Sequence, residues 1–320
     1  MVPLSACLRL LCAAILATLL CSPALAQQPA PEGAAGGQAL TLPADANVGA
    51  DAADTGSVSF IGTATVLIRY AGITILTDPN FLHKGQHAEL GYGLTSERLT
   101  EPAIPIEALP KIDLIILSHF HGDHFDQLVQ EKLDRGIPIV TTPQSAVALE
   151  ALGFQKRIAL QTWESLTVTK GAATVRISAM PGRHGPPILA ALLPNVMGSI
   201  LDFSRNGRPA DYRMYITGDT LVYADISEIP KRFPEVDLAL LHLGGTRILG
   251  VMKVTMDGRD GVRMMQLIAP RRAIPIHYDD YTVFKSPLED FRREVEAAEL
   301  QNRVTYIGRG ERYAFEPRPK

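Results

Sequence analysis

Cysteine is nearly missing from this chain of 320 residues, which contains only Cys7, Cys12 and Cys21. All three fall before residue 22, so the remaining sequence has no thiol with which to form a disulfide. A chain without disulfides is indifferent to an oxidising compartment. Any metal site in the remaining sequence must therefore use ligands other than thiolate sulfur.

Apolar residues form a stretch near the N-terminus, residues 8–20, that carries a single charge. It is followed by Ala24-Leu25-Ala26, which has the pattern of a signal cleavage site. The stretch is short for a membrane span, so a cleaved signal is favoured over an uncleaved anchor. Cys12 and Cys21 each follow a leucine, which disfavours a lipoprotein. We therefore expect a signal peptide over 1–26, cleaved after Ala26, with no transmembrane anchor afterwards and a periplasmic or secreted location.

Basic charge is in short supply, because 31 Lys and Arg residues stand against 34 Asp and Glu residues and give a formal net charge of −3. Nucleic-acid binding needs a basic surface, so we predict no nucleic-acid partner. The sequence also contains no G-x-S-x-G motif and no P-loop. The sequence therefore does not indicate a serine nucleophile or a loop that binds nucleotide phosphates.

Residues 27–56 are rich in Ala, Gly, Pro and Asp and offer little to bury. That composition predicts a flexible linker. From residue 57 the apolar pattern becomes dense, and 57–317 is long enough for one domain with a substantial core. The oligomeric state is not indicated by the sequence.

The most informative stretch is Ser118-His119-Phe120-His121-Gly122-Asp123-His124, which directly follows an apolar run at 114–117. Neutral imidazole nitrogen and carboxylate oxygen are ligands for zinc and its first-row neighbours. His119 and His121 are two residues apart, so a kinked loop can direct both at one ion. Asp123 and His124 point elsewhere, which suits a second ion, and Gly122 supplies the backbone freedom that a tight loop needs.

Three further side chains of types that can ligate metals lie at or just after predicted strand ends, namely His184, Asp219 and His277. Each one alone is more simply interpreted as a loop or turn residue that makes an ordinary hydrogen bond. The ordered set, together with the histidine-rich stretch, is what predicts a site for two metals.

This order of residues resembles the metallo-β-lactamase superfamily. The motifs that carry the resemblance are Thr77-Asp78-Pro79, His119-x-His121-x-Asp123-His124, His184, Asp219 and His277. The sequences of residues 59–68 and 75–79 are similar to those of the branch that contains the ascorbate-phosphate lactonases and the N-acyl-phosphatidylethanolamine phospholipases D. The resemblance covers roughly residues 58–315. It is specific for the superfamily and weakly specific for substrate, because one fold hosts many reactions.

The resemblance implies a role for each matching position. The ligands of the first metal would be His119, His121 and His184. The ligands of the second metal would be Asp123, His124 and His277. Asp219 would bridge the two ions, and Asp78 would hydrogen-bond the ligand loop without touching metal. The resulting cofactors would be two divalent ions, with Zn²⁺ first and Mn²⁺ or Fe²⁺ as alternatives.

The expected chemistry is hydrolysis. Two divalent ions about 3.5–4 Å apart can share a hydroxide and stabilise charge on the attacking and leaving oxygens. The substrate would be a small-molecule or lipid-like lactone, ester, amide or phosphodiester. The predicted catalytic residues are Asp123, Asp219 and His242. His242 is included because it ends a predicted strand on the same edge and could donate to a leaving group or bind an oxyanion. A structural role for His242 is an equal alternative.

Two other functions stay open. One is a mononuclear iron oxidoreductase on the same scaffold, like the persulfide dioxygenases, although the complete second ligand set disfavours it. The other is a non-catalytic metal-binding protein, which an intact set of costly buried ligands disfavours. Residues 91–105, with Tyr92 and Arg98, are our candidate for a substrate wall, because a loop of this length is often functional. His83 could reach substrate or be an ordinary loop histidine.

The predicted fold is α/β (α+β). A hairpin of strands followed by strands that alternate with helices suits two sheets packed face to face with helices outside, which is the four-layer αββα sandwich that the resemblance implies. Strands are predicted over 58–70, 73–77, 114–118, 137–140, 165–169, 174–179, 214–217, 238–241 and 273–276, with 303–307 and 312–315 closing the set. Helices are predicted over 126–133, 145–152, 223–229, 257–268 and 287–300, the last with Ser286 as cap and Pro287 in its first turn.

Overall fold

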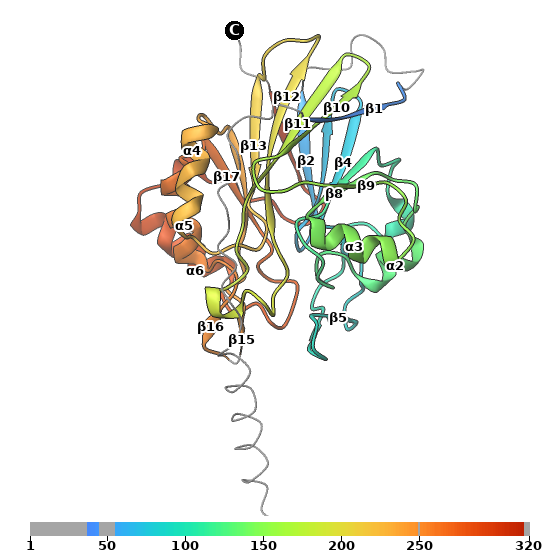
Figure 1. Ribbon diagram of the computed structural model, residues 1–320. Coiled ribbons are helices and arrows are strands. Elements are labelled where there is room, and N and C mark those ends of the chain that lie inside the picture. Colours follow the sequence, from blue (N-terminus) through green and yellow to red (C-terminus); the bar gives the residue numbers. More distant parts are fainter. Residues whose placement is uncertain (1–36, 45–54, 249, 317–320) are drawn as a thin grey trace, which may run out of the picture. The chain divides into compact units, whose positions relative to one another are not determined.

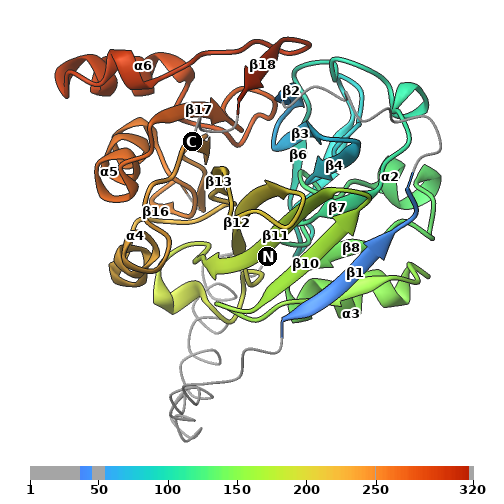
Figure 2. The ribbon, with the colours of Figure 1, turned by 90° about the horizontal axis from the view of Figure 1, so that it is seen from above.

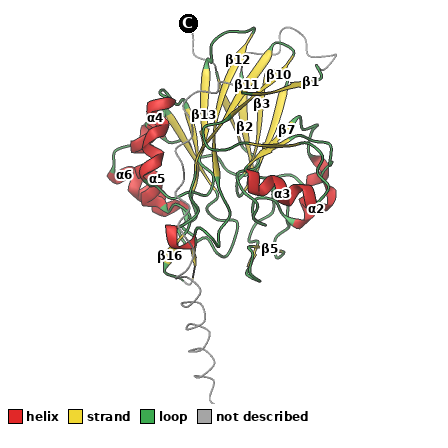
Figure 3. Cartoon of the chain, viewed as in Figure 1, coloured by secondary structure: helices red, strands yellow, loops and turns green. Residues whose placement is uncertain are grey.

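The computed structural model describes residues 37–44, 55–248 and 250–316. Two seven-stranded sheets face each other, with α4, α5 and α6 outside one sheet and α2 and α3 outside the other (Figures 1 and 2). The order of layers is therefore helices, sheet, sheet, helices, which confirms the predicted αββα sandwich (Figure 3). The predicted signal peptide, 1–26, lies outside the described residues. Within the described residues, no helix has both the length and the apolar character needed to cross a membrane.

The first sheet has the strand order β1-β10-β11-β12-β13-β14-β17. Its strands are β1 (Gln38–Leu42), β10 (Ser165–Lys170), β11 (Ala173–Pro181), β12 (Met197–Arg205), β13 (Tyr212–Ile216), β14 (Leu238–His242) and β17 (Arg272–Ile276). The neighbours β13, β14 and β17 run parallel, so their carboxyl ends meet at one edge of the sheet.

The second sheet has the order β18-β2-β3-β4-β7-β8-β9. Its strands are β2 (Gly56–Gly62), β3 (Thr65–Tyr70), β4 (Ile73–Thr77), β7 (Leu114–Ile116), β8 (Ile139–Thr141), β9 (Arg157–Ala159) and β18 (Arg312–Phe315). The run from β4 to β9 is parallel, so it also has one edge of carboxyl ends. Two short ribbons pair β5 (His87–Glu89) with β6 (Thr95–Glu97) and β15 (Arg247–Ile248) with β16 (Met252–Lys253).

The helices are short and cover the outer faces of the sheets. The α-helices are α2 (Gln127–Lys132), α3 (Pro143–Ala151), α4 (Glu228–Arg232), α5 (Gly258–Ile268) and α6 (Leu288–Ala297). The 3-10 turns are η1 (Ile106–Ala108), η2 (Pro187–Leu189), η3 (Ala224–Ser227) and η4 (Gln301–Arg303). Helix α5 begins after Asp257, whose side chain accepts a hydrogen bond from the Asp260 backbone N–H at 3.0 Å.

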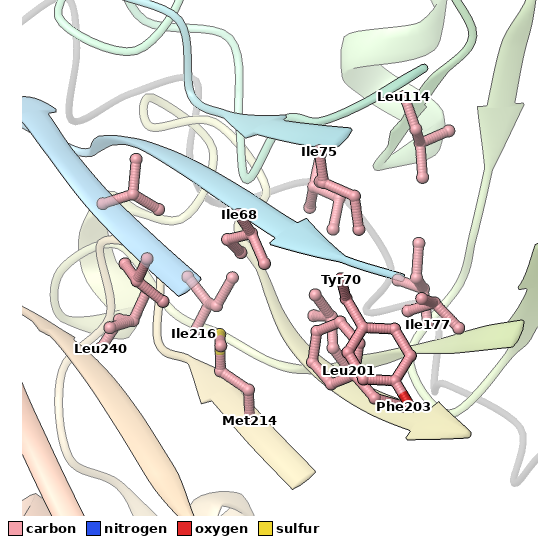
Figure 4. Packing of buried hydrophobic residues seen from close by; sticks show 14 of the residues in the cluster. Ile68, Tyr70, Ile75, Leu114, Ile177, Leu201, Phe203, Met214, Ile216 and Leu240 are labelled. Atoms are coloured by element: carbon pink, nitrogen blue, oxygen red, sulfur yellow. The ribbon is translucent and has the colours of Figure 1, made fainter. Parts of the chain in front are cut away.

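The main core lies between the two sheets and is built from the inward side chains of both. Ile68 and Ile75 from the second sheet and Leu201 and Met214 from the first are all buried, and Figure 4 shows them meeting across the interface. Each such side chain contributes about 1.5–3 kcal/mol when it leaves water. This dry interface fixes the two sheets against each other and so fixes the strand ends that carry the site.

Several sequence expectations need correction. Gln38–Leu42, inside the range expected to be a linker, forms an edge strand because it pairs in parallel with β10. The strand expected over 58–70 is a hairpin, because Thr63 has a left-handed φ of 51° and turns the chain between β2 and β3. The long strand β12 was not predicted at all; its polar Ser199 and Asp202 interrupt the apolar run in the sequence, yet both are buried in the sheet.

Two of the expected C-terminal elements also differ. Residues 303–307 are not a strand: only Val304 makes an isolated bridge, to Ala273. Pro287 is the N-cap residue of α6 and lies before its first turn, and no side chain caps this helix. The helix expected over 223–229 divides into η3 and α4.

Candidate metal centre

All seven predicted ligands follow the carboxyl ends of strands. The loop after β7 carries His119, His121, Asp123 and His124, while His184, Asp219 and His277 follow β11, β13 and β17 respectively. Because these strand ends share one edge of the sandwich, residues up to 158 positions apart in the sequence reach a common volume. The topology of the sheets is thus the reason that the site exists.

The first group of donor atoms consists of three imidazoles, His119, His121 and His184. His121 Nδ1 lies 3.2 Å from His119 Nε2 and 3.3 Å from His184 Nε2. A tetrahedral zinc ion with nitrogen ligands at about 2.0–2.1 Å sets neighbouring ligand atoms about 3.3 Å apart. The spacing of the three nitrogens therefore fits one ion of this kind.

The second group consists of Asp123, His124, Asp219 and His277, all buried. His124 Nε2 lies 3.3 Å from Asp219 Oδ2, and His277 Nε2 lies 3.5 Å from Asp123 Oδ2. Asp219 belongs to the second group by distance and is not in the first. Its expected role as a bridge between two ions therefore stays a prediction.

Backbone carbonyls orient two of the imidazoles. His184 Nδ1 donates to the Val254 carbonyl at 2.8 Å, and His277 Nδ1 donates to the Leu243 carbonyl at 3.2 Å. Each bond fixes the tautomer in which Nε2 has a free lone pair, which is the arrangement that metal-ligating histidines use. His277 also has a left-handed φ of 61°, and its backbone N–H donates to the Thr63 carbonyl at 2.8 Å.

Several buried polar atoms of the second group have no hydrogen-bond partner among the described residues. They are Asp123 Oδ1, His124 Nε2, Asp219 Oδ1 and His277 Nε2. Leaving a buried polar atom unpaired costs about 1–3 kcal/mol, so a folded protein rarely accumulates four in one place. A bound cation would satisfy all four atoms, and the donor set therefore fits a metal.

The two groups differ in their electrostatics. Burial lowers the pKa of His119 and His184 and lowers the pKa of His121 to about 3, so the first group is a set of neutral imidazoles. In the second group burial also lowers the pKa of His124 and His277, but the carboxylates of Asp219 and Asp123 together outweigh burial and raise both pKa values. Burial raises the pKa of Asp123, but His124 and His277 together outweigh burial and bring the pKa to about 2.

Asp78 lies beside the ligand loop, as the resemblance implied. Its Oδ1 accepts a hydrogen bond from the Ser118 backbone N–H at 2.7 Å. Its Oδ2 lies 3.6 Å from His124 Nδ1 and 3.5 Å from His242 Nε2. Asp78 is therefore placed to hold both the loop and one ligand imidazole.

His242 ends β14 and forms a third group of possible donors with Asp78 and His124, and its expected catalytic role stays a prediction. Its side chain is completely buried, its Nδ1 lies 3.2 Å from Thr217 Oγ1, and its Nε2 faces Asp78. It is not among the residues that line the pocket over the site. A residue at the end of a strand can turn into the core as readily as toward solvent, and the sequence does not distinguish these cases.

A pocket of about 430 Å³ opens over both groups. Its base includes His121, Asp123, His184 and Asp219. The expected wall residue Tyr92 does line it, but Arg98 is completely buried elsewhere and pairs with Asp280. His83 is exposed, and its Nδ1 pairs with Glu101 at 2.9 Å.

Other lining residues were missed by the sequence analysis, including Arg247 and the leucines of the 189–193 segment. The signal that could have found them is an excess of large apolar side chains in loops near the ligands, such as Leu90 and Leu94 on either side of a glycine-rich turn.

Fold and site together define the class of this protein: a metallo-β-lactamase-fold protein with a His and Asp metal centre. Residues 74–278 match the Beta-lactamase superfamily domain. A UPF0173 metal-dependent hydrolase of Archaeoglobus fulgidus is 27% identical over 255 residues, which cover 76% of this chain and 98% of the relative. The chain belongs to the β-lactamase superfamily and is a metal-dependent hydrolase of that superfamily.

Solved structures share the fold. An isothiocyanate hydrolase from Delia radicum gut bacteria superposes with a TM-score of 0.67 at 21% identity, covering 81% of this chain and 99% of that chain. Igni18, a metallo hydrolase from Ignicoccus hospitalis, superposes with a TM-score of 0.60 at 21% identity, covering 82% of this chain and 99% of that chain.

Proposed function

We propose that this protein is an exported two-metal hydrolase that cleaves a lactone, an ester or a phosphodiester. The observation that carries the proposal is the pair of converging donor groups at the base of one pocket. Seven buried or half-buried side chains from four strand ends are directed at two neighbouring positions, and four of their polar atoms lack a partner among the described residues. The proposed export rests on the sequence of residues 1–26.

His119, His121 and His184 would hold one ion, and Asp123, His124 and His277 would hold the other, with Asp219 beside both. Nitrogen and oxygen donors without sulfur suit Zn²⁺, and Mn²⁺ or Fe²⁺ are the alternatives. When bound, the two ions supply an acidified water and neutralise charge on the reacting oxygens.

The protein side chains have separate tasks. The carbonyls of Val254 and Leu243 hold His184 and His277 in the ligating tautomer. Asp123 and Asp219 line the pocket and stay ionised at neutral pH, so they can orient a water and accept its proton. Asp78 fixes the loop that carries four ligands through its bond to Ser118.

A panel of lactones, aryl esters and bis(p-nitrophenyl) phosphate tests the proposal on protein loaded with zinc or manganese. Replacing Asp219 by alanine should reduce kcat/KM for the preferred substrate by at least roughly a hundredfold, because this change removes a donor beside the reacting groups. The matched control is Asp225→Ala, which removes an exposed carboxylate in η3 and should leave the rate unchanged.

Normal turnover in Asp219→Ala would refute the two-metal mechanism. One iron per chain with redox activity would instead support the mononuclear oxidoreductase. A site for a single iron would leave the four buried donors of the second group without a function.

A further inference from the structure

The walls of the pocket have a different chemistry from its base. They come mainly from three separate segments: the turn between β5 and β6, the segment that begins with η2, and the β15–β16 ribbon with the residues that follow it; the loop after β17 adds Val283. The apolar side chains that line the pocket are Leu90, Tyr92, Leu94, Leu189, Leu192, Leu193, Ile248, Val254 and Val283. Apart from the base, the only charged side chain among the described lining residues is Arg247.

Three of these nine apolar side chains are exposed. Tyr92 is 75% exposed, Leu94 57% and Leu192 53%, and their neighbours Ile188 and Val251 are 81% and 69% exposed. These five are among seven large apolar side chains that are exposed in the described residues. Single exposed apolar residues are ordinary, but Tyr92, Leu94 and Leu192 all line one pocket, and such a group marks a place that binds something apolar.

The three segments meet at one place. The β5–β6 and β15–β16 ribbons project from the same end of the molecule (Figure 1), and both contribute residues to this pocket. The apolar surface is continuous with His121, Asp123, His184 and Asp219 at the base. A ligand that reaches the base must therefore pass along the apolar walls.

We infer that the substrate is an ester or lactone whose non-reacting part is an uncharged alkyl or aryl group, held by these three segments. The inference rests on the proposed function and narrows its substrate class. A sugar phosphate or another polyanion would need several cations along the walls, and the described lining offers Arg247 as its single cation, with the hydroxyls of Thr95, Thr246 and Thr255 as its other polar side chains outside the base. An alkyl chain needs only apolar contact.

The reaction balances as a simple hydrolysis. Water adds its oxygen to the acyl carbon, the bond from that carbon to the ester oxygen breaks, and the second proton goes to the leaving oxygen. The products are a carboxylic acid and an alcohol, or a hydroxy acid from a lactone.

The first test measures binding and does not depend on turnover. The probe is the neutral dye N-phenyl-1-naphthylamine, displaced by methyl octanoate or by methyl acetate. We expect methyl octanoate to displace the dye and methyl acetate to fail at the same concentration. Leu94→Asp and Leu192→Asp should each weaken dye binding at least tenfold, and both sites are exposed enough to tolerate the change. The matched control is Val147→Asp, which alters a 68% exposed side chain on α3 and should change nothing.

The second test measures kcat/KM for p-nitrophenyl esters from acetate to octanoate. Each buried methylene should raise kcat/KM roughly two- to fourfold in the wild type, and the two aspartate variants should flatten this slope. Dye binding unchanged in both variants, or a rate independent of chain length, would overturn the inference. Turnover of bis(p-nitrophenyl) phosphate alone would overturn the substrate class and leave the hydrolase standing. A metal-loaded protein that hydrolyses no probe but binds the dye as expected would refute the proposed function and retain the apolar site.

Discussion

At the scale of single residues, a buried polar network holds the loops that carry the candidate ligands. Asn80 Nδ2 donates to the Gly122 carbonyl at 3.1 Å, and Asn80 Oδ1 accepts from Tyr281 Oη at 3.0 Å. Arg98 also donates to Asn80 and pairs with Asp280, whose Oδ2 accepts from the Thr63 backbone N–H at 2.7 Å. The network thus ties together the loops that carry Asp78, the histidine-rich stretch and His277.

We predict that Asp280→Asn lowers the free energy of unfolding by about 3–5 kcal/mol, because it leaves the completely buried Arg98 without its countercharge. Urea unfolding at pH 7 measures this loss. The matched control is Glu228→Gln, which breaks an exposed pair with Lys231 and should leave the free energy of unfolding nearly unchanged. A loss of the same size in both variants would contradict the account.

The stabilisation that Asp280 gains from its pairing with Arg98 depends on pH. Burial raises the pKa of Asp280, but Arg309 and Arg98 outweigh it and lower the folded value. The stabilisation is therefore present above the unfolded pKa of about 3.9 and is lost as the pH falls through the lowered folded value. The difference in free energy of unfolding between wild type and Asp280→Asn should stay constant from pH 8 to 6 and shrink only below about pH 4.

Sequence reasoning predicted the residues that converge in the two donor groups and missed this network for a physical reason. His119, His184, Asp219 and His277 could be found because strand ends and metal-binding side chains are both visible in the sequence. Arg98 looks like an exposed loop residue, and only the folded chain shows that Asp280, 182 residues later, lies against it. Long-range pairing of charges leaves no local pattern.

At the scale of elements, the metal loop after β7 is pressed against the β5–β6 ribbon. Gly122 donates its backbone N–H to the Glu89 carbonyl at 2.9 Å. A Cβ at Gly122 would lie 2.4 Å from that carbonyl oxygen and 2.6 Å from the Glu89 nitrogen. The sequence predicted a need for backbone freedom at Gly122, whereas the structure shows a close approach of two backbones.

We predict that Gly122→Ala displaces the metal loop and lowers metal affinity at least roughly tenfold, because the added Cβ meets backbone atoms of Glu89 and the loop that carries Gly122 also carries four of the predicted ligands. Competition with a chromophoric chelator measures the affinity. The matched control is Gly308→Ala, where the nearest atoms to a Cβ are 3.6 Å away and belong to the Glu311 side chain. Equal metal affinity in Gly122→Ala and wild type would show that the loop tolerates the added methyl group.

At the scale of the whole molecule, the sandwich is a frame that brings strand ends together. The order of predicted strands and helices, together with the family resemblance, predicted two packed sheets, although β12, which supplies part of the core between them, was not among the predicted strands. It did not predict β1, since five residues of modest apolarity become a strand only when β10 offers them a free edge. Edge strands depend on their partner more than on their own sequence.

We predict that removing metal destabilises the whole fold, because ions that bind only the folded state stabilise it through mass action. EDTA should lower the melting temperature by about 5 °C or more, and zinc added in excess should restore it. The shift should be much smaller in Asp219→Ala, which has lost a donor. An unchanged melting temperature with EDTA in the wild type would contradict a metal-stabilised centre.

The most direct test of the central claim is the metal content of residues 27–320, purified without chelator, beside the His121→Ala variant. The account predicts close to two divalent ions per chain in the wild type and a clear reduction in the variant, because His121 completes the first donor group. One ion per chain, or none in either protein, would contradict a two-metal hydrolase.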